Sequence, residues 1–408
     1  MKIHSFLSKN NRANSVRYFL LVILVLAFLF FSGDFGLVNV QKTAIVMAVG
    51  VDREADEFIV TSQIAVPKQS GQGGETKTVQ LVSRGKTVAQ AFSQTNAKTG
   101  WYPKLVFCRL ILLGKTAVER DVFDALDFFL LDEYMPDSCL LATCDSNAKD
   151  LLNRSALIDS SGSVAMQKVL SDYAERVGLV LSTTLREFSI GYAGESRSAF
   201  MPILTTAPQQ EKFPNESSSS SNTGAGEADS SGSSSGAQAT TVFSAGETAL
   251  FVGGKRVGKL TEAETFAFNA VKNDLKLASY SVTQDNESCT LSVRHNQPNA
   301  KFRVGKDERA VLQIRLTLTA GLSDYSVAGS PNTYTDSGDI PSWVFPNAEK
   351  KLSEDIRSAF EKCRASGCDL FQLSSFLQKY ENARFDSLKD SVLQTALLDL
   401  SVRFESVR

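Results

Sequence analysis

Two short motifs in the chain combine residue types that perform acyl transfer in other proteins. Ser146 and Lys149 form an S-x-x-K sequence, and Lys98, Thr99 and Gly100 form K-T-G. In penicillin-binding serine acyltransferases the serine motif comes first, K-T-G comes last and S-D-N lies between them. Here the order is reversed and S-D-N is missing. We therefore interpret both motifs as chance matches and expect no catalysis from them.

Other polar candidates also lack the spacing of a working site. The chain has only two histidines, His4 and His295, which argues against a histidine-based triad or a His-rich zinc site. The segment 71–74 is glycine-rich but is not followed by a Lys-Ser/Thr helix start, so a loop is favoured over a phosphate-binding site. The acidic run from Asp52 to Glu57 lacks the glycine and the spacing of a calcium loop, which favours a solvated hairpin turn. We expect no catalytic, cofactor-binding or metal-binding residues, and thus no enzyme.

The six cysteines leave the disulfide state open. Cys139 and Cys144 are close enough in sequence to bridge, as are Cys363 and Cys368 around a turn. Oxidation is favoured outside the cytoplasm, but Cys363 also falls on the core face of a predicted helix. No histidine lies near either pair, so a metal site is not expected there.

Composition indicates a folded protein without a nucleic-acid partner. The chain has 408 residues, 43% of them hydrophobic, enough to build cores, and its length suggests two or three domains. There are 43 Lys and Arg residues against 45 Asp and Glu residues, for a net charge of -2. Nucleic-acid binding depends on a basic surface that neutralises phosphates, so no nucleic acid is expected as a partner.

The amino end predicts a membrane anchor. Residues 1–17 contain four basic and no acidic side chains, and the run from Tyr18 to Phe31 is uninterrupted apolar sequence. Continuation through Leu37 gives roughly 20 residues and a length of about 30 Å, enough to cross a bilayer. No small-x-small cleavage site follows, so an anchor over 18–37 is favoured over a removed signal peptide. The basic tail 1–17 then stays in the cytoplasm, and the chain from residue 38 onward lies outside it.

The rest of the chain divides at a segment rich in Ser and Gly. Residues 208–246 have almost nothing to bury and predict a flexible linker, which joins two domains or forms an exposed loop on one. The region 38–207 precedes it, with a further division into subdomains near 145–160 left open. The region 247–408 follows and predicts a second α+β domain.

Hydrophobic periodicity and helix caps place the elements in these two regions. The predictions for the first region are a hairpin over 44–51 and 58–66, a helix from Thr87 to Ala97, a strand buried on both faces over 105–114, and a helix over 117–131. Those for the second are a hairpin at Gly253-Gly254, a capping box at Thr261 and Glu264, strands over 289–295, 300–304, 311–319 and 396–404, and an amphipathic helix over 347–365 with Leu352, Ile356, Phe360 and Cys363 on one face. We predict an α+β, multidomain mixed α/β fold with antiparallel-rich sheets and packed helices, rather than a doubly wound sheet.

The order and spacing of several segments resemble the Ger(x)C family of spore germination proteins, the C subunits of nutrient germinant receptors. The family has a lipobox L-x-G-C-W-D, then a run like A-I-V-x-G-I-G-I-D, a strand ending in Gly, a helix end L-D-F-F-L-R-D, an opening hairpin with T-E-E-E-T, and D-I-F-G near its end. The similar segments here are, in the same order, Gly33 to Gly36, Ala44 to Asp52, Arg109 to Gly114, Leu126 to Asp132, Ala249 to Thr265, and Asp369 to Phe371.

Two positions depart from the family pattern. Asp34 stands where the lipobox has its cysteine, and it offers no thiol for a lipid thioether, so no lipidation is expected at that site. Phe35 stands in place of the lipobox tryptophan, and no tryptophan follows Phe371. The apolar span itself must then hold the protein in the membrane.

The resemblance implies a function without catalysis. Family members are expected to be three-domain mixed α/β proteins on the outer face of the spore inner membrane, acting with two polytopic receptor subunits in nutrient-triggered germination. The resemblance assigns no side chain to a ligand, so a small-molecule germinant is a partner of the receptor that this subunit need not bind. One alternative is a tethered cell-envelope scaffold unrelated to germination. The other is an anchored hydrolase, which substitution of Ser146 or Lys149 would test.

Overall fold

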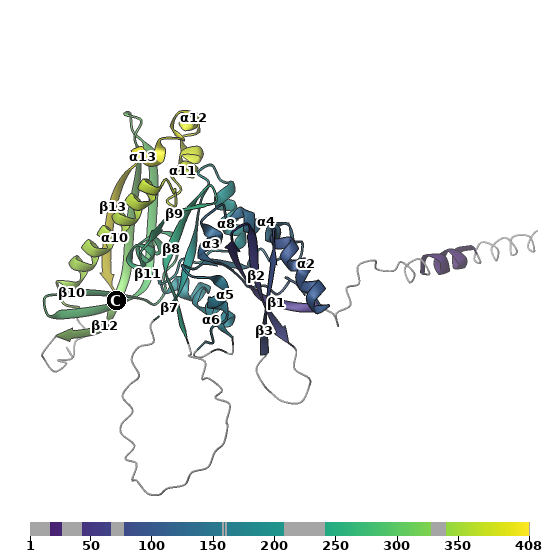
Figure 1. Cartoon of the computed structure of the whole chain (residues 1–408). Helices are drawn as coiled ribbons and strands as arrows, with labels where there is room; N and C mark the ends of the chain where they lie inside the picture. Colours follow the sequence, from purple (N-terminus) through teal and green to yellow (C-terminus); the bar gives the residue numbers. More distant parts are fainter. Residues whose placement is uncertain are drawn as a thin grey trace, which may run out of the picture. The chain divides into compact units, whose positions relative to one another are not determined.

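The computed structural model describes residues 17–26, 43–66, 77–156, 159, 161–207, 241–327 and 340–407 (Figure 1). Residues 17–26 are helical. No helix within these ranges is both long enough and apolar enough to span a membrane. The part of the predicted span after residue 26 lies outside the described residues. The same holds for Asp34, the loop 71–74 and most of the Ser/Gly-rich segment.

A nine-stranded mixed sheet occupies the first half of the chain and continues past the Ser/Gly-rich segment. Its strands are β1 (Thr43–Glu54), β2 (Glu57–Val66), β3 (Lys77–Gly85), β4 (Tyr102–Lys104), β5 (Leu110–Leu113), β6 (Leu140–Thr143), β7 (Ser198–Ala207), β8 (Val242–Val252) and β9 (Lys255–Leu260). They are ordered β3-β2-β1-β5-β6-β7-β8-β9, with β4 paired to β1. The neighbours β1, β5, β6 and β7 are parallel, whereas the outer pairs on both sides are antiparallel.

The predicted hairpin over 44–66 is confirmed, since β1 and β2 pair antiparallel up to Glu54 opposite Glu57. The predicted strand over 105–114 was too long. Only Leu110–Leu113 find partners on β1 and β6, and all four are buried. Val106 and Phe107 belong instead to an exposed turn before the strand. A short parallel strand that is buried on both faces has a continuous apolar sequence without alternation. Its sequence pattern therefore does not distinguish it from the apolar turn that precedes it.

Helices cover both faces of this sheet (Figure 1). The helices α2 (Val88–Thr99), α3 (Lys115–Val118), α4 (Phe123–Leu131) and α8 (Leu185–Ala193) contribute to one core cluster, and α5 (Ala148–Leu152) and α6 (Gly162–Val169) contribute to another. Along β5, Ile111 and Leu113 belong to the first cluster and Leu110 and Leu112 to the second. Since successive strand residues point to opposite faces, the two helix layers lie on opposite sides of the sheet.

The predicted helix over 117–131 is divided in two. The Asp121 carboxylate accepts a hydrogen bond from the Phe123 backbone N–H at 3.0 Å, and the Gly254 carbonyl accepts one from the Val122 N–H at 2.9 Å. These contacts satisfy the first amides of α4 and so start a new helix there. The predicted helix from Thr87 is confirmed, with the Thr87 hydroxyl accepting from the Gln90 N–H.

A second sheet follows in the order β10-β11-β12-β13. Its strands are β10 (Ala278–Gln284), β11 (Glu287–Val304), β12 (Ala310–Val327) and β13 (Leu397–Ser406), and only β12 and β13 are parallel. The predicted strands 289–295 and 300–304 are one continuous strand that passes through Pro298. Beyond Val293, β11 has no partner in the β10 register, so Pro298 lies where the strand is paired with β12 alone, a position at which sheets tolerate proline.

Helices of the second half pack against this sheet and against the first. They are α9 (Glu262–Lys272), α10 (Val344–Ser366), α11 (Leu373–Tyr380), α12 (Phe385–Leu388) and α13 (Val392–Thr395), with a 3₁₀ turn, η2 (Asn382–Arg384), while α7 (Asp172–Arg176) precedes α8. Leu352, Ile356, Phe360 and Cys363 of α10 are all buried, as predicted. One core cluster combines Leu250 of β8, Leu312 of β12 and Phe360.

The Ser/Gly-rich segment does not coincide with a sheet boundary. The predicted β8–β9 hairpin is present, but β8 also pairs antiparallel with β7, from Ala207 opposite Val242 to Ser198 opposite Val252. The strand therefore begins inside the predicted linker, while residues 208–240 lie outside the described ones. The predicted domain boundaries stay predictions. The described fold is mixed α+β and sheet-rich, with packed helices.

Candidate functional site

The structure separates the two acyl-transfer-like motifs. Lys98 and Thr99 end α2, on one face of the first sheet, whereas Lys149 lies in α5 on the opposite face. Ser146 precedes α5, and its backbone carbonyl accepts a hydrogen bond from Lys115 N–H at 3.0 Å. The sheet thus lies between the residues that a serine acyltransferase would have to bring together.

Asp52 is a buried helix cap and not part of a solvated turn, so that interpretation was wrong for this residue. Its side chain is 4% exposed, and its two carboxylate oxygens accept hydrogen bonds from Ala148 N–H at 2.8 Å and Lys149 N–H at 2.9 Å. These amides begin α5, where an anionic acceptor also favours the helix dipole. Burial raises the pKa of Asp52, although both amide hydrogen bonds act to lower it.

The position of Asp52 explains why a glycine, Gly114, follows the neighbouring strand β5. A Cβ atom built on Gly114 would lie 1.8 Å from Asp52 Oδ1, so any side chain there would displace the carboxylate. Two segments that carry the family resemblance, one ending in Asp52 and one in Gly114, therefore meet at a single structural joint. Close approach of two chain segments is a common reason for a fixed glycine.

Two further acidic residues of the resembling segments also cap helices. Asp369 accepts hydrogen bonds from Leu373 N–H and Ser374 N–H, both at 2.8 Å, at the start of α11. Glu264 completes the capping box with Thr261 that the sequence predicted. Both residues are only 4% exposed, and their carboxylates stabilise helix starts. These motifs therefore position elements rather than reacting groups.

The cysteines and His295 form no site in the described chain. All six cysteines are buried free thiols, so neither possible bridge is present. Cys139 contacts Cys108 rather than Cys144, and burial raises the pKa of the Cys144 and Cys368 thiols to about 12. His295 Nδ1 lies 3.3 Å from Asp274 at the surface. No group of three or more His, Cys, Asp or Glu residues suited to a metal occurs among the described residues.

One hollow lies between α8 and α9. Its walls include Ile190, Phe200 and Lys272, and its volume is about 380 Å³. Burial lowers the pKa of Lys272, against the opposing effect of the Glu175 and Glu187 carboxylates. The Lys272 Nζ lies 4.5 Å from the centre of the Phe200 ring, a cation–π distance. The Lys272 ammonium group is thus already bound within the protein by the Phe200 ring and the two carboxylates.

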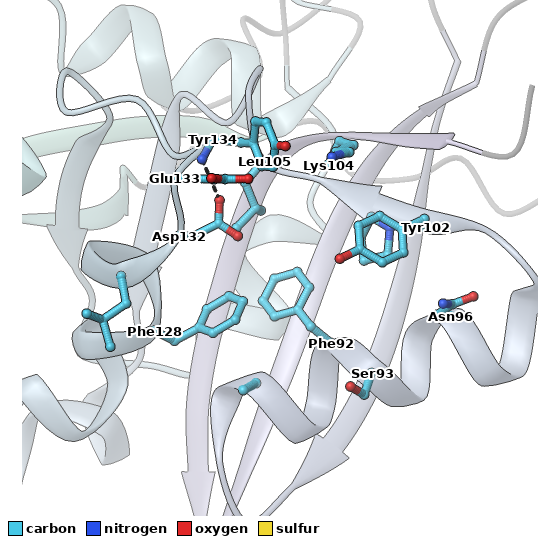
Figure 2. A pocket seen from close by; sticks show the side chains of 13 residues that line it. Phe92, Ser93, Asn96, Tyr102, Lys104, Leu105, Phe128, Asp132, Glu133 and Tyr134 are labelled. Carbon is cyan, nitrogen blue, oxygen red and sulfur yellow. Dashed lines mark hydrogen bonds between the residues drawn. The ribbon is translucent and has the colours of Figure 1, made fainter. Parts of the chain in front are cut away.

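A second pocket, of about 450 Å³, lies between α2, β4 and the end of α4. Figure 2 shows the rings of Phe92 and Phe128 next to each other in its lining, where they stack with their centres 5.0 Å apart. The Asp132 carboxylate accepts a hydrogen bond from Tyr134 N–H at 2.9 Å, which fixes the loop after α4 (Figure 2). Lys104 Nζ lies 3.8 Å from the centre of the Tyr134 ring. The acidic side chain of Glu133 raises the pKa of Tyr134 through a hydrogen bond.

Large exposed apolar side chains line this pocket or lie close to its lining residues in the chain. Leu131 is 85% exposed, and five further members are between 44% and 51% exposed; we call this set the aromatic surface, and it consists of Trp101, Tyr102, Val106, Phe107, Leu131 and Tyr134. Tyr102, Leu131 and Tyr134 line the pocket itself, and the others flank β4 in the chain. Exposed apolar patches of this kind mark sites of protein or membrane contact.

The sequence did not reveal this surface. Val106 and Phe107 were placed in a buried strand, because an apolar turn has the same composition as a buried run. The available signal was local: Gly100 adopts the left-handed conformation that ends α2, and Trp101 follows it directly. A tryptophan that falls in a short connection, outside any helix or strand, indicates an exposed aromatic side chain, which its hydrophobicity alone does not.

The chain matches two family profiles and one solved structure. Residues 37–206 match "Spore germination protein N-terminal domain", and residues 246–405 match "Spore germination B3/ GerAC like, C-terminal". The crystal structure of the GerBC protein is similar at 15% identity with a TM-score of 0.51, over 88% of this chain and 97% of that one. At this identity the likeness shows the fold alone. No curated protein matches significantly.

The two profiles account for most of the chain and follow each other in the expected order. They bracket the Ser/Gly-rich segment, and their residues include the capping joints at Asp52, Glu264 and Asp369 described above. The chain therefore belongs to the Ger(x)C family of spore germination proteins.

Proposed function

We propose that the chain is a non-enzymatic, membrane-anchored, extracytoplasmic subunit of a spore nutrient germinant receptor, acting through protein contacts. The observation that carries this proposal is the match of both family profiles, one on each side of the Ser/Gly-rich segment. The placement of the acyl-transfer-like motifs on opposite faces of the sheet supports a role without catalysis. So does the use of Asp52 and Asp369 as helix caps.

The anchor in this proposal is the apolar sequence over 18–37, since Asp34 offers no thiol for lipidation. The basic residues before it remain cytoplasmic by the positive-inside rule. The folded part then lies on the outer face of the spore inner membrane, beside two polytopic receptor subunits.

The test is a crosslinked capture of a tagged copy from detergent-extracted spore membranes, with proteins identified by mass spectrometry. Recovery of two polytopic subunits, together with an intact amino terminus on the captured chain, is the expected result. A Leu24→Arg, Val25→Arg variant is the matched control, because two charges within the apolar span oppose insertion and should remove the chain from the membrane fraction.

Other outcomes contradict the proposal in separate ways. Capture of neither subunit, with abundant protein in membranes of growing cells, would indicate a tethered envelope scaffold unrelated to germination. An amino terminus located after residue 31 would show that the apolar segment is a removed signal peptide and not an anchor.

A further inference from the structure

The aromatic surface has the composition of a membrane-contact site. It combines one Trp, two Tyr, one Phe and two aliphatic residues, and Trp and Tyr prefer the boundary between lipid headgroups and acyl chains. The nearby charges nearly balance, because Lys104 at the pocket rim is opposed by Asp132 and Glu133. Attraction to this surface is therefore apolar rather than electrostatic.

The location of the aromatic surface beside the start of β1 favours the lipid bilayer as its apolar partner. Its central strand, β4, pairs with β1. In β1, the residues from Ala48 to Val51 pair parallel with β5, and Arg109, just before β5, donates its backbone N–H to the Met47 carbonyl. Because β4 comes before β5 in the chain, we place it on the part of β1 before Ala48. The aromatic surface thus lies beside the first residues of the strand that enters the folded part of the chain.

The connection from the proposed anchor to this strand is short. Only five residues, 38–42, separate Leu37 from Thr43, and a fully extended chain of this length reaches about 20 Å. A chain that leaves a bilayer at residue 37 therefore holds the start of β1 within about 20 Å of the lipid. Exposed aromatic side chains beside that point are therefore within reach of the headgroups.

We propose that the aromatic surface around β4 rests on the phospholipid bilayer and orients the folded part of the protein on the membrane. This inference rests on the proposed anchor over 18–37. It adds a second, non-covalent contact to the single tether: apolar burial of Leu131 and Phe107 together with interfacial seating of Trp101, Tyr102 and Tyr134.

The tryptophan content of the chain allows a direct test. Trp101 and Trp343 are its only tryptophans, and Trp343 packs partly buried against the core of the second sheet. The full chain carrying Trp343→Phe is reconstituted into phosphatidylcholine vesicles that contain a shallow-brominated phosphatidylcholine. We expect Trp101 emission to fall about twofold relative to unbrominated vesicles, as for a side chain at the headgroup boundary. Quenching should persist at high salt because the contact is apolar.

Two controls make the result specific. The Trp101→Phe chain keeps only Trp343, whose emission should not change with bromination. In the Trp343→Phe background, Leu131→Asp should reduce quenching of Trp101, because a charge at this highly exposed position opposes insertion. Leu179→Asp, at a position that is 59% exposed in another part of the fold, should leave it unchanged.

Vesicle flotation separates failure of this inference from failure of the anchor. If the chain floats with vesicles and Trp101 is not quenched, the anchor stands and the bilayer contact is overturned. If Trp101 is unquenched in vesicles and a photo-crosslinker at position 107 captures a receptor subunit in spore membranes, the surface belongs to a protein partner instead. If the chain does not float, both the anchor and the contact are overturned.

Discussion

Buried carboxylates act as joints between segments that are distant in the chain. Asp52 on β1 binds the first amides of α5, almost a hundred residues later, and Gly114 makes room for it. Its environment is costly, since burial raises the pKa of this group despite the two amide donors. A buried acceptor of this kind stabilises the fold only while both of its hydrogen bonds are made.

Replacement of Asp52 by Asn should therefore destabilise the protein. The amide nitrogen of Asn would face a backbone N–H, so at least one hydrogen bond to Ala148 or Lys149 is lost, at a cost of about 1–3 kcal/mol in the free energy of unfolding. Chemical denaturation of the purified full-length chain measures this. Asp56→Asn is the matched control, because the Asp56 side chain is 93% exposed on the same hairpin and its change should stay within about 0.5 kcal/mol. Equal effects of the two variants would contradict the capping role.

At the scale of elements, Glu264 joins the start of α9 to the middle of α10. It accepts hydrogen bonds from the Thr261 N–H at 2.8 Å, from the Ser358 hydroxyl at 2.6 Å and from Lys362 Nζ at 2.6 Å. Burial alone would raise its pKa, but these donors outweigh burial and the pKa of Glu264 is lowered. A carboxyl with a lowered folded pKa adds stability above its unfolded pKa and loses it as the pH falls through the folded value.

The Glu264→Gln variant should show this pH dependence. Gln keeps the shape of the capping box but loses the charge that binds Lys362, so we expect a loss of about 1–2 kcal/mol at neutral pH. The difference from the parent chain should be complete above pH 4.5, the ordinary value for this group, and should shrink as the pH falls further. Urea titrations across this range provide the measurement, with the exposed Glu262→Gln as control. A difference that stays constant with pH would exclude the charged contact.

Local signals in the sequence were sufficient for some elements and not for others. Thr87, and Thr261 with Glu264, correctly predicted helix starts, because a cap depends on residues three positions apart. The parallel centre of the first sheet was not predicted, since β5 and β6 are four residues each and gain their stability from non-local neighbours. The exposure of Phe107 was not predicted for the same reason. Whether an apolar residue is buried depends on which strands, distant in sequence, pair with its segment, and Phe107 lies before the paired residues of β5.

At the scale of the whole chain, the Ser/Gly-rich segment interrupts the sequence but not the sheet. The family profiles end at 206 and resume at 246, whereas β7 and β8 on either side of the segment pair along their lengths. Leu250 of β8 also shares a core cluster with Leu312 and Phe360. The contacts between β7 and β8 therefore do not depend on the covalent connection through 208–240.

This continuity predicts that a chain cut within the segment stays assembled. A site-specific protease sequence inserted after Ser219 would allow cleavage of the purified protein there. The β7–β8 ladder and the shared core bury backbone and apolar side chains between the two fragments, so both should elute together by size exclusion in native buffer and separate only in denaturant. The uncut inserted chain provides the reference elution volume. Separation of the fragments in native buffer would mean that β7 and β8 do not form one sheet in solution, and that the two profile regions are independent domains joined only by a linker.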